Sequence, residues 1–375
     1  MKADIIAHAL RLGAGSVRVV PAGADAETAE RLRAAFARGD FETWPYDEAY
    51  AARAADPSAL LLDARSVICV AIPYGAPRPR WAPSRGMVSN YAWFGDYHTK
   101  VRRLLRELAA FIDERAGGPA TAVICDTAAL AERAFAARSG LGWVGKHTNL
   151  IAPQLGSYVF LGEIVTTLDL SADAPLRKTC GACRRCVDVC PTQALRGDYT
   201  IDATRCISDL TQRVDGIPRE LRALVGLWVW GCALCQEICP PTRRAGIATA
   251  ESPAPENAAP SLFAMLSMRS GAYKRVFRPT AMGWRGAAVL RRNAAVALGN
   301  TLDRAAVPAL ERALTEDPHP MVREHVAWAL GRIRSPRCLQ ALAARLDAEP
   351  DHSVRREIAH CLEPLDPNGA LEQVS

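Results

Sequence analysis

The hydrophobic pattern in the N-terminal part of the chain changes between helical and strand spacing. Apolar positions recur at helical spacing in three segments, residues 3–12, 26–38 and 98–115. Short apolar runs rich in β-branched residues predict three strands, at residues 66–72, 121–125 and 158–165. Helices and strands mixed in this way predict an N-terminal α/β or α+β domain.

The C-terminal part of the chain follows a different pattern, an internal repeat with a long period. Ala-Leu-Gly at 297–299 recurs at 329–331, and Ala-Leu at 309–310 recurs at 341–342. Each unit has room for two helices, so the pattern predicts a HEAT-like solenoid of about two and a half repeats. The Pro-rich residues 240–260 before it predict a linker.

Basic charge is concentrated ahead of these repeats. The formal net charge of the 375-residue chain is only +6, but residues 257–302 contain seven Lys or Arg residues and no Asp or Glu. Tyr273, Phe277 and Trp284 lie among the basic residues. Basic residues interleaved with aromatic ones are typical of surfaces that bind nucleic-acid phosphates and bases. A solvated basic face would have the same composition.

Three arginines occupy equivalent places in successive repeats: Arg291, Arg323 and Arg355. Stacked repeats would align them as a basic ridge that could hold a nucleic-acid backbone. Local pairing with Glu324 and Glu357 is the alternative.

The most specific chemical signal is a run of cysteines. Cys180, Cys183, Cys186 and Cys190 form the C-x₂-C-x₂-C-x₃-C-P pattern of bacterial ferredoxins. A second run has Cys232, Cys235 and Cys239, again followed by proline, and Cys206 lies between the runs. Eight thiolates are enough for two [4Fe–4S] clusters.

Ferredoxin pairing predicts a crossed ligand assignment. One cluster would take Cys180, Cys183, Cys186 and Cys239, and the other would take Cys190, Cys206, Cys232 and Cys235. Two structural zinc ions are the alternative use of eight cysteines, but zinc pairs are usually separated along a chain.

The rest of the composition indicates the cellular compartment of the protein. Twelve cysteines without a recognisable signal peptide favour reduced thiols and metal ligation over disulfides. No apolar run is long enough for a membrane span. We therefore expect a cytosolic, soluble protein with no membrane partner. The four other cysteines, Cys69, Cys125, Cys338 and Cys361, are expected to be buried small hydrophobes.

Candidate catalytic chemistry follows the strand predicted at 121–125. Asp126 begins the next segment, where it could be a helix N-cap or a functional carboxylate. Farther on, Gly140, Gly142 and Gly145 surround Trp143, and Lys-His-Thr-Asn follows at 146–149. A glycine-spaced polar loop can lie close to a large ligand, although a tight irregular turn has the same composition.

These motifs, taken together and in order, resemble the epoxyqueuosine reductase family. The shared stretches are NYAWFGDYH at 90–98, Asp126-Thr127, Glu132-Arg133, GLGWVGKHTNLI at 140–151, GSYVFLGEIVTTL at 156–168 and both cysteine runs. The resemblance extends from about residue 60 to the C-terminus. The chain departs from the family pattern at His147 and Tyr158, where Asn and Trp are usual.

The resemblance implies an α+β fold with three domains. Residues 1–170 would form a cobalamin-binding catalytic domain related to that of reductive dehalogenases. Residues 171–245 would form a ferredoxin-like domain with two [4Fe–4S] clusters. Residues 246–375 would hold the linker and the HEAT-like repeats, which would bind tRNA.

The implied reaction reduces epoxyqueuosine to queuosine in the tRNA anticodon loop. Electrons from a donor such as ferredoxin or flavodoxin would pass through the two clusters to cobalamin, in a protein expected to be a monomer. Asp126 would be the proton donor, for which we expect a raised pKa. A reductive dehalogenase-like enzyme acting on a small molecule, or a non-catalytic electron carrier or RNA adaptor, would use similar motifs.

The resemblance also implies particular contacts. The expected cobalamin-binding residues are Asp126, Tyr97, His98, Lys146, His147, Thr148, Ser157, Ser208 and Thr211. With tRNA as the substrate, the basic block and the repeat arginines predict its binding residues: Lys274, Arg275, Arg285, Arg291, Arg292, Asn293 and Arg323.

Overall fold

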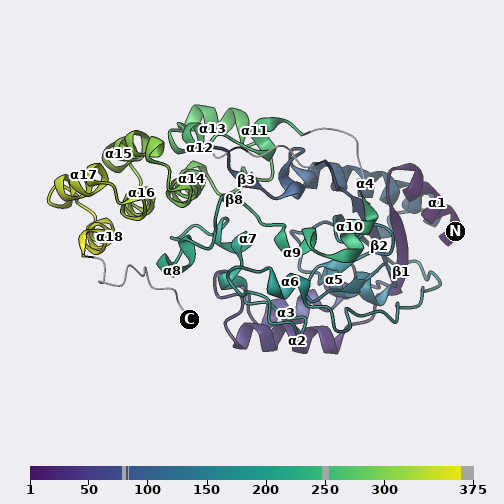
Figure 1. The fold of residues 1–375 in the computed structure, drawn as a ribbon. Helices are drawn as coiled ribbons and strands as arrows, with labels where there is room; N and C mark the ends of the chain where they lie inside the picture. Colours follow the sequence, from purple (N-terminus) through teal and green to yellow (C-terminus); the bar gives the residue numbers. More distant parts are fainter. Residues whose placement is uncertain (78–81, 83, 247–252, 365–375) are drawn as a thin grey trace. The chain divides into compact units, whose positions relative to one another are not determined.

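The computed structural model of the protein describes residues 1–77, 82, 84–246 and 253–364 (Figure 1). Its residues fall into two compact units. The first unit contains Met1–Pro77, Asp96–Cys206 and Ala233–Ser252, and the second contains Arg78–Gly95, Ile207–Cys232 and Pro253–Ser375. The domain boundaries suggested by the sequence, after residues 170 and 245, stay a prediction.

The first unit is built on a four-stranded sheet in the order β1-β2-β7-β4, with every neighbouring pair antiparallel. Its strands are β1 (Ser16–Pro21), β2 (Ser66–Pro73), β4 (Thr121–Ile124) and β7 (Val159–Thr166). The three strands expected from the sequence are confirmed. Strand β1 was not foreseen, because its six residues form a short edge strand that contains Arg18.

Helices cover both faces of this sheet (Figure 1). Helices α1 (Lys2–Arg11) and α4 (Tyr97–Ala116) pack their apolar side chains on one face, and α5 (Glu132–Arg138) packs on the other. Helices α2 (Ala26–Ala37) and α3 (Glu48–Ala54) contact each other and complete the N-terminal region. The helices expected at 3–12, 26–38 and 98–115 are therefore confirmed within one or two residues.

Short elements carry the loops and the cysteine runs of the first unit. They are η1 (Pro57–Ala59), β5 (Trp143–Val144), β6 (Leu150–Ile151), α6 (Arg185–Asp188), η3 (Ala203–Arg205), α9 (Leu234–Glu237) and α10 (Pro240–Ala245). Strands β5 and β6 pair as a small hairpin around the polar loop. Helices α6 and α9 contact each other, which brings the two cysteine runs together.

The second unit begins with short elements that surround a parallel strand pair, β3 (Met87–Val88) with β8 (Trp228–Trp230). The other short elements are η2 (Asn90–Ala92), α7 (Ile207–Leu210), α8 (Arg219–Arg222), α11 (Pro255–Ala258), α12 (Leu262–Leu266), α13 (Ser270–Val276) and η4 (Arg304–Ala306). The predicted linker at 240–260 is thus wrong at both ends, where α10 and α11 form. Residues 247–252 lie outside the described residues.

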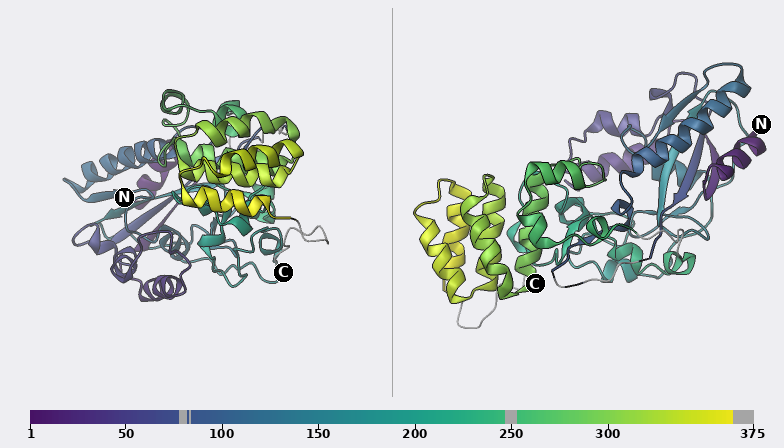
Figure 2. Two further views of the ribbon diagram at one scale, coloured as in Figure 1. Left: turned by 90° about the vertical axis from the view of Figure 1, so that its left-hand side faces the viewer. Right: turned by 90° about the horizontal axis from the view of Figure 1, so that it is seen from above.

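Five longer helices form the predicted solenoid: α14 (Ala287–Thr301), α15 (Val307–Glu316), α16 (Pro320–Ile333), α17 (Pro336–Leu346) and α18 (His352–Leu362). Figure 2 shows these helices stacked side by side. Gly299, from the repeated Ala-Leu-Gly triplet, lies where a Cβ atom would be 2.8 Å from Ala329 Cα. The repeated glycine therefore allows α14 and α16 to pack closely.

The arginines of the repeat do not form a free basic ridge, and this corrects the expectation for Arg291 and Arg323. Arg291 Nε donates to Asp317 at 2.6 Å, and Arg323 Nη2 donates to Glu349 at 2.7 Å. Arg291 is mostly buried, with 13% of its side chain exposed, and Asp317, Arg323 and Glu349 are buried, with exposed fractions of 5%, 9% and 0%. Asp317 and Glu349 are separated along the chain by the same number of residues as Arg291 and Arg323. The same ion pair therefore recurs in successive repeats.

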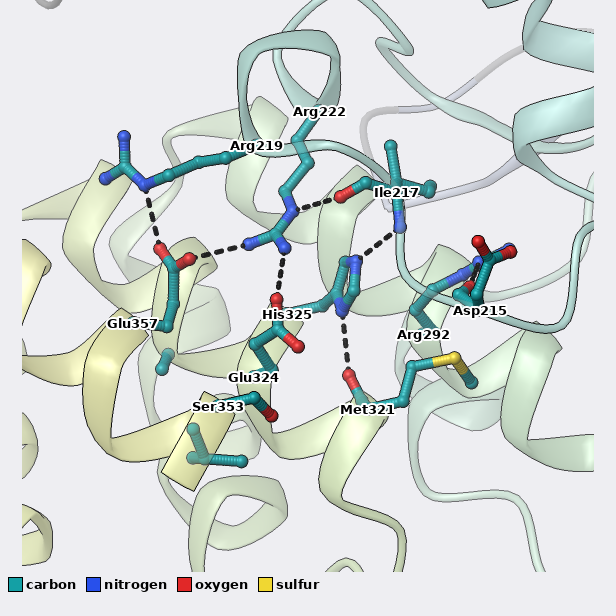
Figure 3. Close-up of polar contacts among 12 residues, drawn as sticks. Asp215, Ile217, Arg219, Arg222, Arg292, Met321, Glu324, His325, Ser353 and Glu357 are labelled. Atoms are coloured by element: carbon teal, nitrogen blue, oxygen red, sulfur yellow. Dashed lines mark hydrogen bonds and ion pairs between the residues drawn. The ribbon is translucent and has the colours of Figure 1, made fainter. Parts of the chain in front are cut away.

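Glu324 and Glu357, offered from the sequence as partners of these arginines, bind a different segment (Figure 3). Arg222 contacts both glutamates, and Arg219 Nε donates to Glu357 at 3.1 Å. His325 Nε2 accepts from the Ile217 N–H at 2.9 Å. The solenoid therefore holds residues 217–222 by charged and neutral contacts together.

Arg292 and Asn293 are also structural rather than exposed. Arg292 is fully buried, and its guanidinium donates to the carbonyls of Leu210 and Asp215. Asn293 Nδ2 donates at 2.8 Å to the carbonyls of Thr211 and Val229. Burial of unpaired backbone carbonyls is costly, so these two side chains stabilise the segment that follows Cys206.

Helices long and apolar enough to cross a membrane are absent from the described parts of the chain.

We predict that Arg291→Met lowers the free energy of unfolding by about 3 kcal/mol, because it leaves the buried Asp317 carboxylate without its cation. Adding Asp317→Asn should recover part of the loss. The exposed Arg312→Ala serves as a control and should change stability by less than about 0.5 kcal/mol. Chemical denaturation followed by circular dichroism measures all four proteins. A stable Arg291→Met protein that binds nucleic acid more weakly would restore the ridge hypothesis.

Candidate functional site

Asp126 lies just beyond the end of β4 and before α5. It is not the N-cap of that helix, because α5 begins at Glu132 and Ala131 occupies the N-cap. Its backbone has a φ of 61°, a left-handed conformation that is unusual for a residue other than glycine. Its side chain is 57% exposed. The fold therefore presents the carboxylate at the surface on a constrained turn.

Two side chains from the first turn of α4 hold this carboxylate. The Tyr97 hydroxyl donates to Asp126 Oδ2 at 3.1 Å, and His98 Nε2 contacts the same oxygen at 3.1 Å. The other ring nitrogen of His98 lies 2.6 Å from Asp96 Oδ1. Asp96 also caps α4 by accepting the His98 N–H. An imidazolium ring between two carboxylates satisfies both contacts, since both of its nitrogens then donate.

The pKa values follow from these contacts. The hydrogen bond to Asp126 is the largest influence that raises the pKa of His98 above its ordinary 6.5. The same bond lowers the pKa of Asp126 below 3.8, despite partial burial. The raised pKa expected for Asp126 is therefore wrong for this arrangement. Here the proton is held by His98 rather than by Asp126.

Aromatic packing fixes the two donors. The Tyr97 ring is parallel to that of Phe160 on β7, with centroids 4.5 Å apart, and the His98 ring stacks on Tyr97 at 4.0 Å. Stacked rings have little rotational freedom. The position of the Asp126 carboxylate is thus determined by the sheet through Phe160.

The polar loop beyond α5 contains the next group of candidate residues. His147 is 2% exposed, and burial lowers its pKa to about 4. Its Nδ1 accepts the Asn149 N–H at 3.2 Å, so the proton of the neutral ring is on Nε2. That Nε2 and the indole nitrogen of Trp143 are buried without a hydrogen-bond partner among the described residues. Thr148 has a left-handed φ of 62°, and its carbonyl accepts from Arg133 at 2.9 Å.

Two of the expected cofactor residues contact the cysteine runs instead. Lys146 Nζ donates at 2.9 Å to the carbonyl of Gly181, which follows Cys180. Ser157 is buried, and its hydroxyl lies 2.8 Å from the hydroxyl of Thr242, just after Cys239. These contacts join the sheet that positions Asp126 to both cysteine runs.

Four thiols of these runs lie near one another. Burial raises the pKa of Cys186 to about 11, and the neighbouring Cys180 and Cys239 contribute to the increase. Burial also raises the pKa of Cys239, with contributions from Cys180 and Cys183. Cys180, Cys183, Cys186 and Cys239 are unbridged thiols. They form the group that ferredoxin pairing assigns to one cluster.

No three Cys, His, Asp or Glu side chains of the described residues lie close enough together to hold a single metal ion. The cluster interpretation therefore rests on the spacing of the cysteines and on the proximity of these four thiols.

Several residues near Asp126 were given no role by the sequence alone. Glu132 Oε1 accepts the Asp126 N–H at 2.7 Å, and Glu163 is fully buried beside it. Tyr46 and Tyr50 stack with centroids 4.4 Å apart, and the charge of Asp126 contributes to raising the pKa of each. For Glu163 a signal was available, since it is the only charged residue within β7.

The remaining predicted residues lie in the second unit. Thr211 is buried, and its hydroxyl accepts the Gly231 N–H at 2.9 Å and donates to the Ile207 carbonyl at 2.9 Å. The Ser208 carbonyl accepts from Gln212 at 2.9 Å. These contacts show a structural role for Ser208 and Thr211 and reveal no other role.

The predicted tRNA-binding residues separate into two groups. Arg292, Asn293 and Arg323 are buried, Arg291 is mostly buried, and all four make the contacts described above. Lys274 and Arg275 are exposed on α13. The Arg285 guanidinium lies over the Trp284 ring at 3.7 Å, and Trp284 is 52% exposed. A basic, aromatic surface therefore remains at α13 and the segment after it.

Three family models match the chain. A model described as "Epoxyqueuosine reductase QueG, DUF1730" matches residues 54–127, a 4Fe-4S double cluster binding domain matches 179–242, and HEAT repeats match 286–363. The predicted two-cluster segment and the predicted solenoid are confirmed by the last two models.

Curated relatives cover most of the chain. An epoxyqueuosine reductase of Staphylococcus aureus is 35% identical over 336 residues, which are 88% of this chain and 87% of the relative. One of Listeria monocytogenes is 32% identical over 335 residues, 88% of each chain.

Solved structures show the same likeness. A crystal structure of epoxyqueuosine reductase with an epoxyqueuosine-modified tRNA-Tyr stem loop matches with a TM-score of 0.90 at 31% identity, over 96% of this chain and 97% of that one. A Bacillus subtilis epoxyqueuosine reductase with its catalytic aspartate loop swung out of the active site matches with a TM-score of 0.89 at 30% identity, over 96% and 98%.

We predict that His98 titrates above 6.5 and that Asp126→Asn lowers its pKa more than Asp96→Asn does, since Asp126 makes the largest contribution. The charged form of His98 is favoured by folding. Its contribution to stability is therefore complete below pH 6.5 and is lost as the pH rises through the raised pKa. Nuclear magnetic resonance of labelled histidine rings measures the titration. An unshifted His98, or an equal response to both variants, would contradict the geometry.

Proposed function

The chain belongs to the epoxyqueuosine reductase family and is an oxidoreductase, and from this premise we propose that it reduces epoxyqueuosine to queuosine in the anticodon loop of a tRNA. The observation that carries the proposal is the Asp126 carboxylate, exposed on a constrained turn and held by Tyr97 and His98. The same sheet is joined to the cysteine runs by Lys146 and Ser157. The Asp126 carboxylate and seven of the eight cysteines thus lie in the first unit.

The net reaction defines what the protein must supply. An epoxide that becomes an alkene takes up two electrons and two protons and releases one water molecule. We propose that the electrons come from a ferredoxin or flavodoxin, and that the reaction takes place in the cytoplasm.

We propose two [4Fe–4S] clusters with the crossed assignment. One would be held by Cys180, Cys183, Cys186 and Cys239, and the other by Cys190, Cys206, Cys232 and Cys235. The mutual influence of the first four thiols on their pKa values supports the first set. The second set rests on the ferredoxin spacing alone.

We propose that cobalamin binds beside Asp126. The unpartnered N–H donors of His147 and Trp143 fit a ligand rich in amide oxygens, after small side-chain adjustments. Tyr97, His98 and the loop at 146–148 would hold it, whereas Ser157 and Thr211 are engaged inside the protein. When bound, cobalamin supplies a cobalt centre that becomes a strong nucleophile on reduction.

The residues around Asp126 supply the proton for the departing oxygen. His98 holds this proton at Nε2, against Asp126 Oδ2, because the pKa of His98 is raised and that of Asp126 is lowered. Transfer to Oδ2 makes Asp126 a carboxylic acid, which can then protonate the substrate oxygen. Asp96, on the far side of the ring, stabilises the imidazolium and so controls how readily the proton leaves.

We further propose that the loop carrying Asp126 has more than one position, as the B. subtilis relative with its catalytic loop swung out suggests. Residues 127–131 form bends and irregular structure rather than helix between β4 and α5, so little regular structure would be lost by movement. An outward position would separate Asp126 from His98 and let substrate enter.

For tRNA we propose the surface of α13 and the following segment. Lys274 and Arg275 are exposed, and the Arg285 guanidinium is stacked on Trp284. Cations of this kind bind phosphates, and an exposed indole ring can stack on a base. Arg291, Arg292, Asn293 and Arg323 would contribute by holding the scaffold.

We predict that Asp126→Asn abolishes formation of queuosine, since amide oxygen cannot carry the proton to the substrate. Anaerobically reconstituted protein, with cobalamin and a chemical reductant, would be tested on tRNA containing epoxyqueuosine by mass spectrometry of its nucleosides. The variant should keep about eight iron atoms per chain, as two clusters require, and its cobalamin spectrum. Activity in the variant would remove Asp126 from the mechanism, and an inactive wild type would contradict the proposed function.

We predict that Lys274→Ala with Arg275→Ala weakens tRNA binding and lowers the slope of log affinity against log salt by about 2, one for each phosphate contact. Arg312→Ala, on the exposed side of α15, is the matched control. Filter binding across a salt series gives both quantities. Equal slopes for wild type, double variant and control would place the tRNA elsewhere.

A further inference from the structure

A buried carboxyl group lies behind the catalytic turn. Glu163 is in the middle of β7, where its neighbours on the adjacent strands are Cys69 of β2 and Ile124 of β4. These two residues belong to the apolar cluster under α5, so Glu163 faces that cluster as well. It is 0% exposed, and neither of its oxygens receives a hydrogen bond from a donor group among the described residues.

An isolated carboxylate in such a place is highly unfavourable, so Glu163 must bind a proton. Burial raises its pKa well above 4.5, and the nearby Glu132 adds to the effect. Glu132 begins α5, which packs on the face of the sheet that Glu163 occupies. Each of the two carboxyl groups influences the pKa of the other, so Glu132 is close enough to share this proton.

Glu132 links this buried proton to Asp126. As the first residue of α5, it extends its carboxylate to the Asp126 N–H, with Oε1 at 2.7 Å from the nitrogen. Burial raises the pKa of Glu132 to about 7, with the charge of Asp126 contributing. Two carboxyl groups in contact titrate as a pair, and the first proton is held far more tightly than the second.

The surroundings do not neutralise the pair. The titratable and charged groups that influence its two members and the adjoining thiols are Asp126, Cys125, Cys69, Tyr50, Arg133, Arg138 and Arg102. Of the cations, Arg133 acts on Glu132 but donates its own hydrogen bond to the Thr148 carbonyl. The pair therefore depends on its shared proton.

We propose that Glu132 and Glu163 form a proton-sharing latch that holds the Asp126 turn against His98. With one proton, carried by Glu163, the Glu132 carboxylate is an anion and accepts the Asp126 N–H in a charge-assisted hydrogen bond. With a second proton, Glu132 is neutral and the bond loses that assistance. The left-handed turn then has less to hold it, and Asp126 separates from His98.

Glu132 and Glu163 are therefore positioning residues for Asp126. The part of this inference that concerns activity rests on the proposed function. Its pH dependence has a definite sign. The latch closes as the pH rises through about 7, the pKa of Glu132. Proton supply from His98 fails as the pH rises through the raised pKa of that ring. A bell-shaped dependence of kcat/KM on pH follows, with an acid limb that belongs to the latch.

The first test measures the position of Asp126 without measuring catalysis. His98 owes its raised pKa chiefly to Asp126, so its ring titration reports whether the two side chains are in contact. In cluster-loaded protein, Glu132→Ala should lower the pKa of His98 towards 6.5, as Asp126→Asn does. Glu163→Gln, whose amide still donates to Glu132, should leave it raised. An unchanged His98 in folded Glu132→Ala protein would overturn the latch.

Glu132→Gln keeps the test decisive if the alanine variant is unstable. Its amide oxygen still accepts the Asp126 N–H but has no charge to lose, so the acid limb of kcat/KM should disappear while the alkaline limb stays. We expect kcat/KM at the optimum to fall about tenfold to a hundredfold, the scale of a small misplacement of a catalytic group. An acid limb that remains in Glu132→Gln would assign that limb to another group.

The shared proton has its own signature. The infrared spectrum of the wild type at neutral pH should contain the carbonyl band of a buried, protonated carboxyl group, and Glu163→Gln should remove it. A spectrum without that band would show that both groups are ionised. The exposed Glu107→Gln, on α4, is the matched control and should change neither spectrum nor His98 titration. Because these readouts need no substrate, they separate failure of the latch from failure of the proposed function.

Discussion

A close backbone approach joins the four-stranded sheet to the segment that follows the second cysteine run. Gly156 has a φ of 68°, and a Cβ atom there would be 2.5 Å from Thr242 Cα. The Ser157 N–H donates to the Thr242 hydroxyl at 3.0 Å, and Thr242 in turn hydrogen-bonds to Cys239. Since Phe160 of the same segment positions Tyr97, which holds Asp126, the Asp126 carboxylate and the thiol of Cys239 are positioned by one stretch of backbone. A side chain at residue 156 would separate them.

Buried ion pairs determine which segments of the second unit pack together. The repeat contains an arginine and, 26 residues later, an acid, and the two form an ion pair that recurs in successive repeats. Arg222, at 3% exposure, bridges Glu324 and Glu357, so the solenoid also holds the segment that follows Cys206. Such pairs contribute little net stability compared with apolar packing, but breaking one leaves a buried charge. They therefore fix which surfaces meet, which suits a scaffold that carries a binding face.

The sequence predicted what depends on spacing along the chain. The helices, three of four strands in the main sheet, the cysteine motif and the repeat are all periodic or local patterns. It failed where a side chain's partner is distant. The buried arginines were mistaken for phosphate ligands, although Asp317 and Glu349 recur with the same period and could have revealed the pairing. The pKa of Asp126 was expected to rise because a proton donor must hold its proton near neutral pH, whereas His98, 28 residues earlier in the chain, lowers it.

The chemistry around Asp126 shows why burial and charge must be considered together. Its side chain faces the His98 ring, whose hydrogen bond lowers the pKa of the carboxylate, and its backbone N–H faces Glu132, next to the buried Glu163. The positive ring draws the carboxylate towards α4, while the anionic Glu132 holds the peptide group towards α5. These two attractions act on opposite ends of one residue and stabilise a left-handed turn that the aspartate would not adopt alone. A carboxylate held in this way can be released by a change in a single proton, without any change in the surrounding core.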